Sequence, residues 1–181
     1  PGMLVGKILY ANVPHARIVS IDTSRAKKIT GVKAVLTAQD TPRIKFGFGK
    51  DNLPLKDKVL SRRDEVAAVA AVDEDAAYEA LALIQVEYEP LLPVFDAFDA
   101  LEPGAPRVHE SRPSNLFDKY DYAHGDGARG LDTADVVVED EFEIGWATYA
   151  ALEPTTCMAQ WDTQGHLTIW SPTQIPFLLQ R

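Results

Sequence analysis

Residues 65–89, EVAAVAAVDEDAAYEALALIQVEYE, contain the pattern that decides the fold. The run at 66–72 is continuously small and apolar, as expected for a strand that is covered on both faces. Asp73 then supplies an N-cap for a helix through Ile84, and the acidic residues after it suit the positive end of the helix dipole. Residues 85–89 alternate polar and apolar side chains, which predicts a half-buried strand. The stretch therefore predicts a strand, a packing helix and a second strand.

One face of the predicted helix is suited to close packing. Its apolar positions recur at helical spacing, and they are Ala77, Ala80, Leu81 and Ile84. Two alanines in this set permit a close approach to a sheet.

The first third of the chain adds short strands to this unit. Val, Ile and Leu are concentrated in three runs that predict strands at 4–9, 17–21 and 32–36. Residues 23–29 predict one or two helical turns with a Ser or Thr N-cap and Gly31 beyond the C-terminus. Residues 41–58 lack an apolar period and are rich in turn residues, so they predict a long connection.

The second half of the chain begins with a stretch rich in proline, glycine and isolated charges. This stretch, residues 93–130, predicts a connecting arm with only a short helix at 97–101. Three further strands are predicted at 134–144, 157–161 and 167–171. The sequence therefore predicts an α+β protein with a first domain at 1–99, an arm at 100–133 and the incomplete start of a β-rich domain at 134–181.

Composition narrows the class of protein. The 181 residues include 27 acidic and 18 basic side chains, and the net charge of -9 argues against nucleic acid and anionic membranes as partners. No apolar run approaches the roughly 20 residues that span a bilayer, and the start lacks the features of a signal peptide. Cys157, the single cysteine, favours a reducing compartment, so we expect a cytoplasmic protein. Both ends suggest a chain cut out of something longer.

Few residues point to chemistry by themselves. The sequence contains no G-x-G-x-x-G, Walker A, H-E-x-x-H or C-x-x-C motif. Cys157 stands among apolar strand residues, where a buried thiol usually packs as a small hydrophobe. The histidines occur singly, so we assign no catalytic residue and no metal ligand among His15, His109, His124 and His166.

Two kinds of charged cluster stand out. Asp64 with Glu65, and the acidic residues at 73–75, are explained by solvation and helix capping rather than acid–base chemistry. The densest basic region is suited either to guiding a phosphate-bearing ligand or an acidic subunit, or simply to a solvated loop. It comprises Arg43, Lys45, Lys50, Lys56, Lys58, Arg62 and Arg63.

A series of segments resembles the large subunit of the aldehyde oxidase and xanthine dehydrogenase family. Those similar to the family's α/β hammerhead domain occur in the family's order at 3–9, 14–18, 21–24, 31–37, 66–70 and 84–89. Those similar to the start of its molybdopterin-binding region lie at 134–139, 152–154 and 170–174. The resemblance covers nearly the whole chain and implies a hammerhead domain followed by the start of a molybdopterin-binding domain.

Within the family, two segments look most like 4-hydroxybenzoyl-CoA reductases, namely 54–62 and 79–84. Two departures from the family pattern are present. Arg63, Asp64 and Glu65 stand where Gly-Glu-Pro is usual, so we expect a different loop geometry there. Residues 149–151 stand where a His or an aromatic residue often precedes Leu-Glu-Pro, which leaves the substrate open.

The resemblance implies a molybdenum–molybdopterin cofactor in the complete subunit, and iron–sulfur clusters and FAD in partner subunits. It carries over one cofactor-binding residue, Gln174, which matches the family glutamine whose amide hydrogen-bonds the oxo ligand on molybdenum. The remainder of the large subunit would hold the other active-site parts.

The implied reaction is reductive dehydroxylation of an aromatic acyl-CoA such as 4-hydroxybenzoyl-CoA. One alternative is oxidative hydroxylation of an aldehyde or N-heterocycle by the same family. Another is a chain that by itself serves as a non-catalytic assembly or interaction module.

Overall fold

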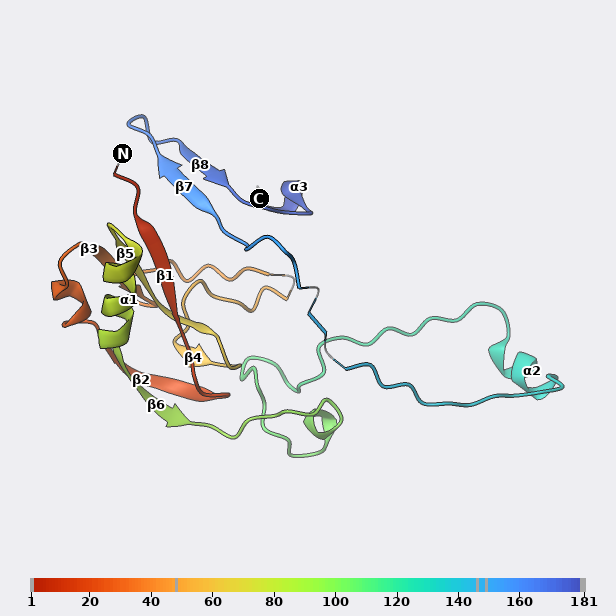
Figure 1. The fold of residues 1–181 in the computed structure, drawn as a ribbon. Helices are drawn as coiled ribbons and strands as arrows, with labels where there is room; N and C mark the ends of the chain where they lie inside the picture. The colour runs from red at the N-terminus through yellow and green to blue at the C-terminus, as the bar shows by residue number, and fades with distance from the viewer. Residues whose placement is uncertain (1, 48, 146, 149, 180–181) are drawn as a thin grey trace. The chain divides into compact units, whose positions relative to one another are not determined.

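The computed structural model describes residues 2–47, 49–145, 147–148 and 150–179, which divide into two compact units at residues 1–122 and 123–181. The first unit contains two small antiparallel sheets (Figure 1). One sheet has the strand order β1 (Val5–Tyr10), β5 (Glu65–Ala71), β3 (Val32–Thr37). The other has the order β4 (Lys58–Val59), β2 (Ala16–Asp22), β6 (Gln85–Pro90).

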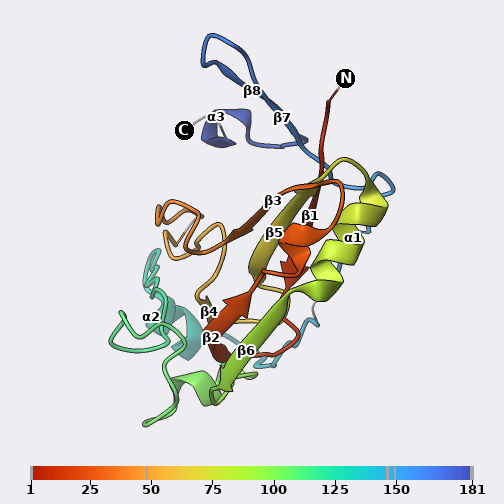
Figure 2. The ribbon, with the colours of Figure 1, turned by 90° about the vertical axis from the view of Figure 1, so that its left-hand side faces the viewer.

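Helix α1 (Glu74–Leu83) lies along one face of the sheet β1-β5-β3, as Figure 2 shows. Its start is fixed by Asp73, whose side chain accepts a hydrogen bond from the backbone N–H of Ala76 at 2.8 Å. The core between helix and sheet consists mainly of small side chains. It includes Ala67, Val69, Ala71, Ala76, Ala77, Ala80 and Ile84. The expected strand–helix–strand unit is confirmed.

Strand β5 is covered unequally on its two faces. The face toward α1 is fully buried, whereas on the opposite face Val66 is buried and Ala68 and Ala70 are only half-buried. Val66 belongs to a second apolar cluster with Ala16 and Val59, between β2, β4 and β5. Coverage on both faces, as the apolar run suggested, is therefore complete at only one end of the strand.

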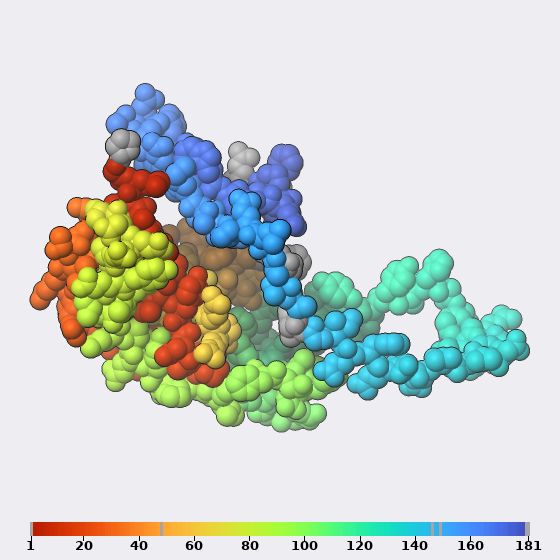
Figure 3. Space-filling view, viewed as in Figure 1, coloured from red at the N-terminus to blue at the C-terminus, as the bar shows by residue number. Residues whose placement is uncertain are grey.

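The expected helical turn between β2 and β3 is a short 3-10 helix, η1 (Ala26–Lys28), whose Ala26 is fully buried beside α1. Figure 3 shows this segment in orange next to the yellow-green side chains of α1. Its preceding residue, Arg25, makes no side-chain cap, so the expected Ser or Thr N-cap is wrong. Gly31 follows with a φ of +93°, and a Cβ there would lie 2.8 Å from Val72 Cγ2. The turn therefore needs glycine.

The long connection at 41–58 ends in an element that the pattern did not predict. Strand β4 has only two residues, and it pairs with Ala16 and Arg17 at the start of β2. The short helix expected at 97–101 is present as the 3-10 helix η2 (Asp99–Leu101).

Arg63 occupies a turn conformation that favours glycine. Its φ is +75°, while its guanidinium lies 5.3 Å from the centroid of the Tyr10 ring. The turn is held by Asp64, whose carboxylate accepts hydrogen bonds from the backbone N–H groups of Leu60 at 2.7 Å and Ser61 at 3.2 Å. Arg63 is therefore in the left-handed region, where a non-glycine residue is strained.

We predict that Arg63→Gly is more stable than Arg63→Ala by about 1 kcal/mol, because both variants lose the contact with Tyr10 and only glycine adopts the left-handed conformation without strain. Urea denaturation of both variants and the parent chain measures the difference. Equal losses of unfolding free energy would contradict the strain at Arg63.

The second unit contains a hairpin and two short helices. Strands β7 (Met158–Trp161) and β8 (Leu167–Trp170) pair antiparallel across a turn, as expected, and helices α2 (Gly127–Asp132) and α3 (Pro176–Leu179) were not expected. The strand expected at 134–144 is wrong: the described part of the chain shows no ladder for it. An extended segment becomes a strand only when its backbone groups have a partner.

No described side chain of the second unit is buried, and only Ser171 is even partly covered. Trp161 is 67% exposed and Ile144 is 92% exposed. Cys157 is exposed as well, so the expected buried packing role for it is wrong. A two-stranded hairpin without a core is marginal by itself, so this unit needs further protein surface against its apolar side chains.

Candidate functional site

Ion pairs join the segment that follows β6 to the rest of the first unit. Glu110 accepts a hydrogen bond from Lys58 Nζ at 2.9 Å and from Arg17 Nη2 at 3.3 Å. Arg112 Nη2 lies 3.6 Å from Asp51 Oδ2. The part of the predicted connecting arm at 93–117 is therefore fastened to β2, β4 and the loop before β4. From here on, only this part is called the arm.

Asn115 closes the arm on itself. Its amide Nδ2 donates to the carbonyl oxygens of Ala100 at 3.0 Å and Pro106 at 2.9 Å, and its Oδ1 accepts from the N–H of Val108 at 2.9 Å. All three polar positions of this side chain are thus used. Neither Asn115 nor Glu110 was recognised from the sequence, because nothing in an irregular segment marks which polar residue makes distant contacts.

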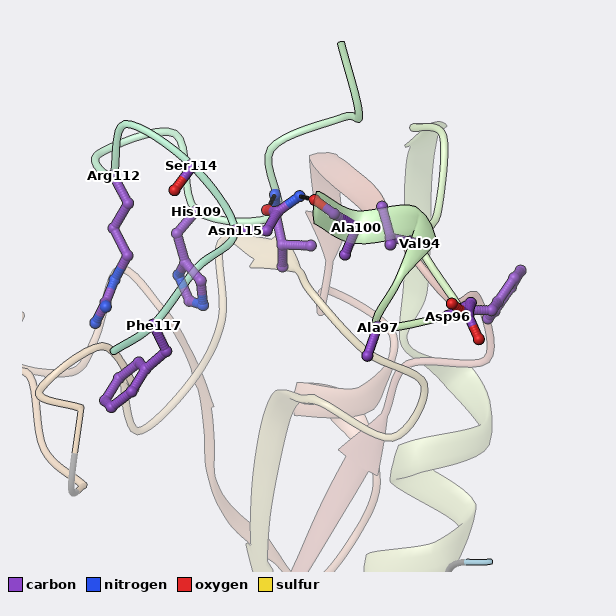
Figure 4. Close-up of a pocket in the computed structure, with 11 residues that line it drawn as sticks. Val94, Asp96, Ala97, Ala100, His109, Arg112, Ser114, Asn115 and Phe117 are labelled. Atoms are coloured by element: carbon purple, nitrogen blue, oxygen red, sulfur yellow. Dashed lines mark hydrogen bonds between the residues drawn. The ribbon is translucent and has the colours of Figure 1, made fainter. Parts of the chain in front are cut away.

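A pocket of about 360 Å³ opens between the limbs of the arm. Figure 4 shows His109 and Phe117 on one side and Val94 and Ala97 on the other. Arg112 stacks over the Phe117 ring at 4.6 Å. The polar groups of the lining are engaged elsewhere, since Asp96 accepts backbone N–H groups, Asn115 bonds the arm and His109 lies 3.7 Å from Asp51, which suits packing rather than chemistry.

Three cations of the basic region predicted from the sequence are engaged within the unit, and no ion pair of the other four is recorded among the described residues. Arg43 pairs with Asp57 at 2.7 Å, and Lys58 pairs with Glu110. Lys56 is buried, with its ammonium group donating to Asn52 Oδ1 and to the carbonyl of Leu53. A hollow of about 220 Å³ is lined by cations and by balancing acids, namely Arg43, Lys45, Lys56, Lys58, Asp51, Asp57 and Glu110. This charge balance favours a structural role for the region over a phosphate site.

The acidic residues considered from the sequence also have structural roles, since Asp64 holds the loop at Leu60 and Asp73 caps α1. Among the described residues, no group of three His, Cys, Asp or Glu side chains could hold a metal ion. Two of the histidines have partners within the chain: His15 is buried, with Nδ1 2.9 Å from the carbonyl oxygen of Leu92, and His166 Nδ1 lies 3.1 Å from Asp162 Oδ2.

None of the helices in the described part of the chain has the length and apolar character of a membrane span.

The ion pairs of Glu110 make the arm sensitive to pH. Hydrogen bonds from Lys58 and then from Arg17 hold the pKa of the Glu110 carboxyl below its ordinary value of 4.5. A carboxyl with a lowered folded pKa contributes stability above its unfolded pKa and loses that contribution as the pH falls through its folded pKa. We call the two ion pairs of Glu110, with Lys58 and Arg17, the clasp. The clasp is complete at neutral pH and is lost when the pH falls below the ordinary carboxyl pKa of 4.5 and through the lowered pKa of Glu110.

We predict that Glu110→Gln speeds hydrogen exchange of the arm at neutral pH and has little effect in acid, where the parent carboxyl is already protonated. Glu102→Gln is the matched control, because no ion pair of Glu102 is recorded among the described residues. Hydrogen exchange at 93–117, corrected for intrinsic rates, measures the effect. A difference between parent and Glu110→Gln that persists unchanged in acid would contradict the clasp.

Gln174 lies in a bend between β8 and α3 and is exposed. Proline precedes it at Pro172 and follows it at Pro176, and the hydroxyl of Thr173 accepts a hydrogen bond from the backbone N–H of Ile175 at 3.1 Å. No hydrogen bond to the Gln174 amide is recorded within the described ranges. The amide is therefore available to a group outside this part of the chain. Tyr149, which precedes the Leu-Glu-Pro motif, lies outside the described residues.

Comparisons with known proteins match two parts of the chain to two family models. Residues 1–92 match the model of the aldehyde oxidase and xanthine dehydrogenase a/b hammerhead domain, and residues 108–181 match that of the molybdopterin cofactor-binding domain.

Two curated relatives illustrate the similarity. One is a probable xanthine dehydrogenase subunit of Bacillus subtilis, which is 37% identical over 96% of this chain and 24% of its own length. The other is the nicotinate dehydrogenase large molybdopterin subunit of Eubacterium barkeri, which is 36% identical over 97% of this chain and 42% of its own length.

The fold is also similar to that of a solved Cu,Mo-CO dehydrogenase. The TM-score is 0.86 at 36% sequence identity, and the match covers 99% of this chain and 25% of that one. This chain thus spans less than half the length of the proteins that it matches.

Proposed function

Because the chain belongs to the aldehyde oxidase and xanthine dehydrogenase family, we propose that it forms the leading part of the molybdopterin-bearing subunit of a molybdenum hydroxylase-type oxidoreductase. The single observation that carries this proposal is the pair of consecutive family matches, which together span nearly the whole chain. In the proposed division, the hammerhead domain occupies 1–99, a connecting segment 100–133, and the start of the cofactor-binding domain 134–181.

We further propose that Gln174 is the contact of this chain with the cofactor. Two observations support this role: the side chain is exposed, and its amide is free of recorded partners within the described residues. When bound, the molybdenum cofactor would supply two-electron redox chemistry. The neutral amide of Gln174 would donate a hydrogen bond to it without a change in protonation.

For the reaction, we propose oxidative hydroxylation, in which a substrate R–H and water give R–OH, two protons and two electrons. The names of the relatives support this class, since they include a nicotinate dehydrogenase and a xanthine dehydrogenase. We propose an N-heterocycle or an aldehyde as the substrate rather than CO, because both carry the C–H bond that this reaction hydroxylates. The two electrons require an acceptor, and the proposed iron–sulfur and FAD subunits provide one.

The second candidate is reductive dehydroxylation of an aromatic acyl-CoA such as 4-hydroxybenzoyl-CoA, which is supported by the sequence similarity at 54–62 and 79–84. The structure gives many of these positions a packing role, because Leu55, Val59 and Ala80 are buried in the first unit. Similarity at buried positions reports how a domain packs and carries little information about a substrate. The oxidative reaction is therefore preferred.

The exposed apolar surface supports the proposed partners. In the first unit Phe95 is 84% exposed and Phe98 is 77% exposed, and in the second unit Phe142 is 85% exposed. Large apolar side chains exposed in such numbers are typical of surfaces that other protein covers. We propose that the remainder of the large subunit and the partner subunits cover them.

The substrate is tested on the assembled enzyme, purified with its cofactors. We expect turnover with N-heterocycles or aldehydes and a dye as electron acceptor, with label from ¹⁸O-water entering the product. Turnover only with 4-hydroxybenzoyl-CoA and a low-potential donor would instead establish the reductive reaction.

We predict that Gln174→Ala in the assembled enzyme lowers turnover per bound molybdenum while leaving subunit association intact. Loss of one preorganised donor costs up to about 2.7–4 kcal/mol of transition-state stabilisation, and a donor beside the metal contributes part of that range. Turnover, metal content and melting temperature are measured together, with the exposed Gln164→Ala in the β7–β8 turn as control. Unchanged turnover per metal would refute the role of Gln174, whereas a lower melting temperature with normal turnover would give it a structural role.

A further inference from the structure

The turn that carries Gln174 leaves little freedom to its backbone. Pro172 and Pro176 each have a fixed φ, and each restricts the residue before it to extended conformations, so Ser171 and Ile175 are restricted as well. Only Thr173 and Gln174 keep ordinary freedom. The placement of the Gln174 backbone, and with it the direction of the Gln174 Cα–Cβ bond, therefore depends on the dihedral angles of these two residues.

A hydrogen bond from Ile175 to Thr173 restricts three of those remaining angles, ψ of Thr173 and both φ and ψ of Gln174. Thr173 Oγ1 accepts from the backbone N–H of Ile175 at 3.1 Å, and the ring so closed encloses the backbone of Gln174. Ser and Thr hydroxyls form such turns locally, without support from distant residues. The carbonyl of Ile175 in turn accepts from the N–H of Leu178 at 3.0 Å, which joins the turn to the first turn of α3.

Local fixation matters here because burial does not supply it. Thr173 and Gln174 are both exposed, and no described neighbour in the second unit is buried against them. A side chain is normally held by packing and by supporting hydrogen bonds. For Gln174 within the described chain, the recorded support is the proline pair and the Thr173 hydroxyl.

We propose that Thr173 is a positioning residue that holds the backbone of Gln174 at the place from which its amide reaches the cofactor. This inference rests on the proposed cofactor role of Gln174. Thr173 itself makes no contact with the cofactor in this proposal. Its hydroxyl acts through the backbone, so that its loss frees the Gln174 backbone and displaces the base of the side chain that carries the amide.

The test uses four variants of the complete, assembled enzyme. Thr173→Val removes the acceptor but keeps the branched shape, and Thr173→Ser keeps the acceptor. Gln174→Ala removes the amide, and the double variant Thr173→Val with Gln174→Ala measures whether the two residues act as one unit.

We expect Thr173→Val to lower turnover per bound molybdenum by about fivefold, the equivalent of one ordinary hydrogen bond, and Thr173→Ser to restore most of it. The Mo(V) electron paramagnetic resonance spectrum should shift in Thr173→Val in the same direction as in Gln174→Ala. In the Gln174→Ala background, Thr173→Val should cause no further loss. Hydrogen exchange of the Ile175 amide should speed up in Thr173→Val and stay slow in Thr173→Ser.

The outcomes separate this inference from the proposed function. If Gln174→Ala leaves turnover per metal and the spectrum unchanged, the cofactor role of Gln174 fails and the positioning role fails with it. If Gln174→Ala is impaired, the positioning role alone is overturned by any of three results: a normal Thr173→Val, a Thr173→Ser as impaired as Thr173→Val, or losses that add in the double variant.

Discussion

The close approach of α1 to β5 is the constraint on which the first unit depends. Ala77 and Ala80 on the helix and Ala67 and Ala71 on the strand are fully buried against one another, so the two backbones lie close together. Larger side chains at such positions force displaced rotamers and typically cost about 1–3 kcal/mol. The small residues therefore set the distance between helix and sheet, and the strands on either side take their places from β5.

The second unit lacks any comparable constraint. Its hairpin places Ala159, Trp161, Leu167 and Ile169 on one face, and no described residue covers that face. An amphipathic hairpin of this kind gains stability only when another layer packs on it. The two units therefore differ in kind: the first contains its own core, and the second contributes one layer to a core completed by other protein surface.

The sequence predicted the first unit, which contains its own core, better than the second unit, which does not. In the first unit, period and capping predicted the strand–helix–strand unit, because α1 packs its small apolar face on β5, the strand that precedes it in the sequence. The same reasoning failed at 134–144, where alternation indicated a strand whose partner is not among the described residues, and at Cys157, whose surroundings remain exposed. Glu110 and Asn115 were missed because side-chain contacts across an irregular arm have no periodic signature. Gln174 could be named only through the family resemblance, since spacing and composition do not distinguish one surface glutamine from another.

The turn at 171–176 shows how a precise position can be encoded without burial. Two prolines and one hydroxyl restrict six residues through local terms alone, and such terms are present before the surrounding domain is complete. Such an arrangement suits a side chain that contacts a cofactor held mainly by other parts of a protein. The local backbone is restricted whether or not those other parts are in place. The clasp at Glu110 follows a different logic, since it joins distant segments through charge and therefore depends on pH. The two arrangements therefore differ in range: local terms restrict the turn at 171–176, whereas charge joins the arm to distant strands of the first unit.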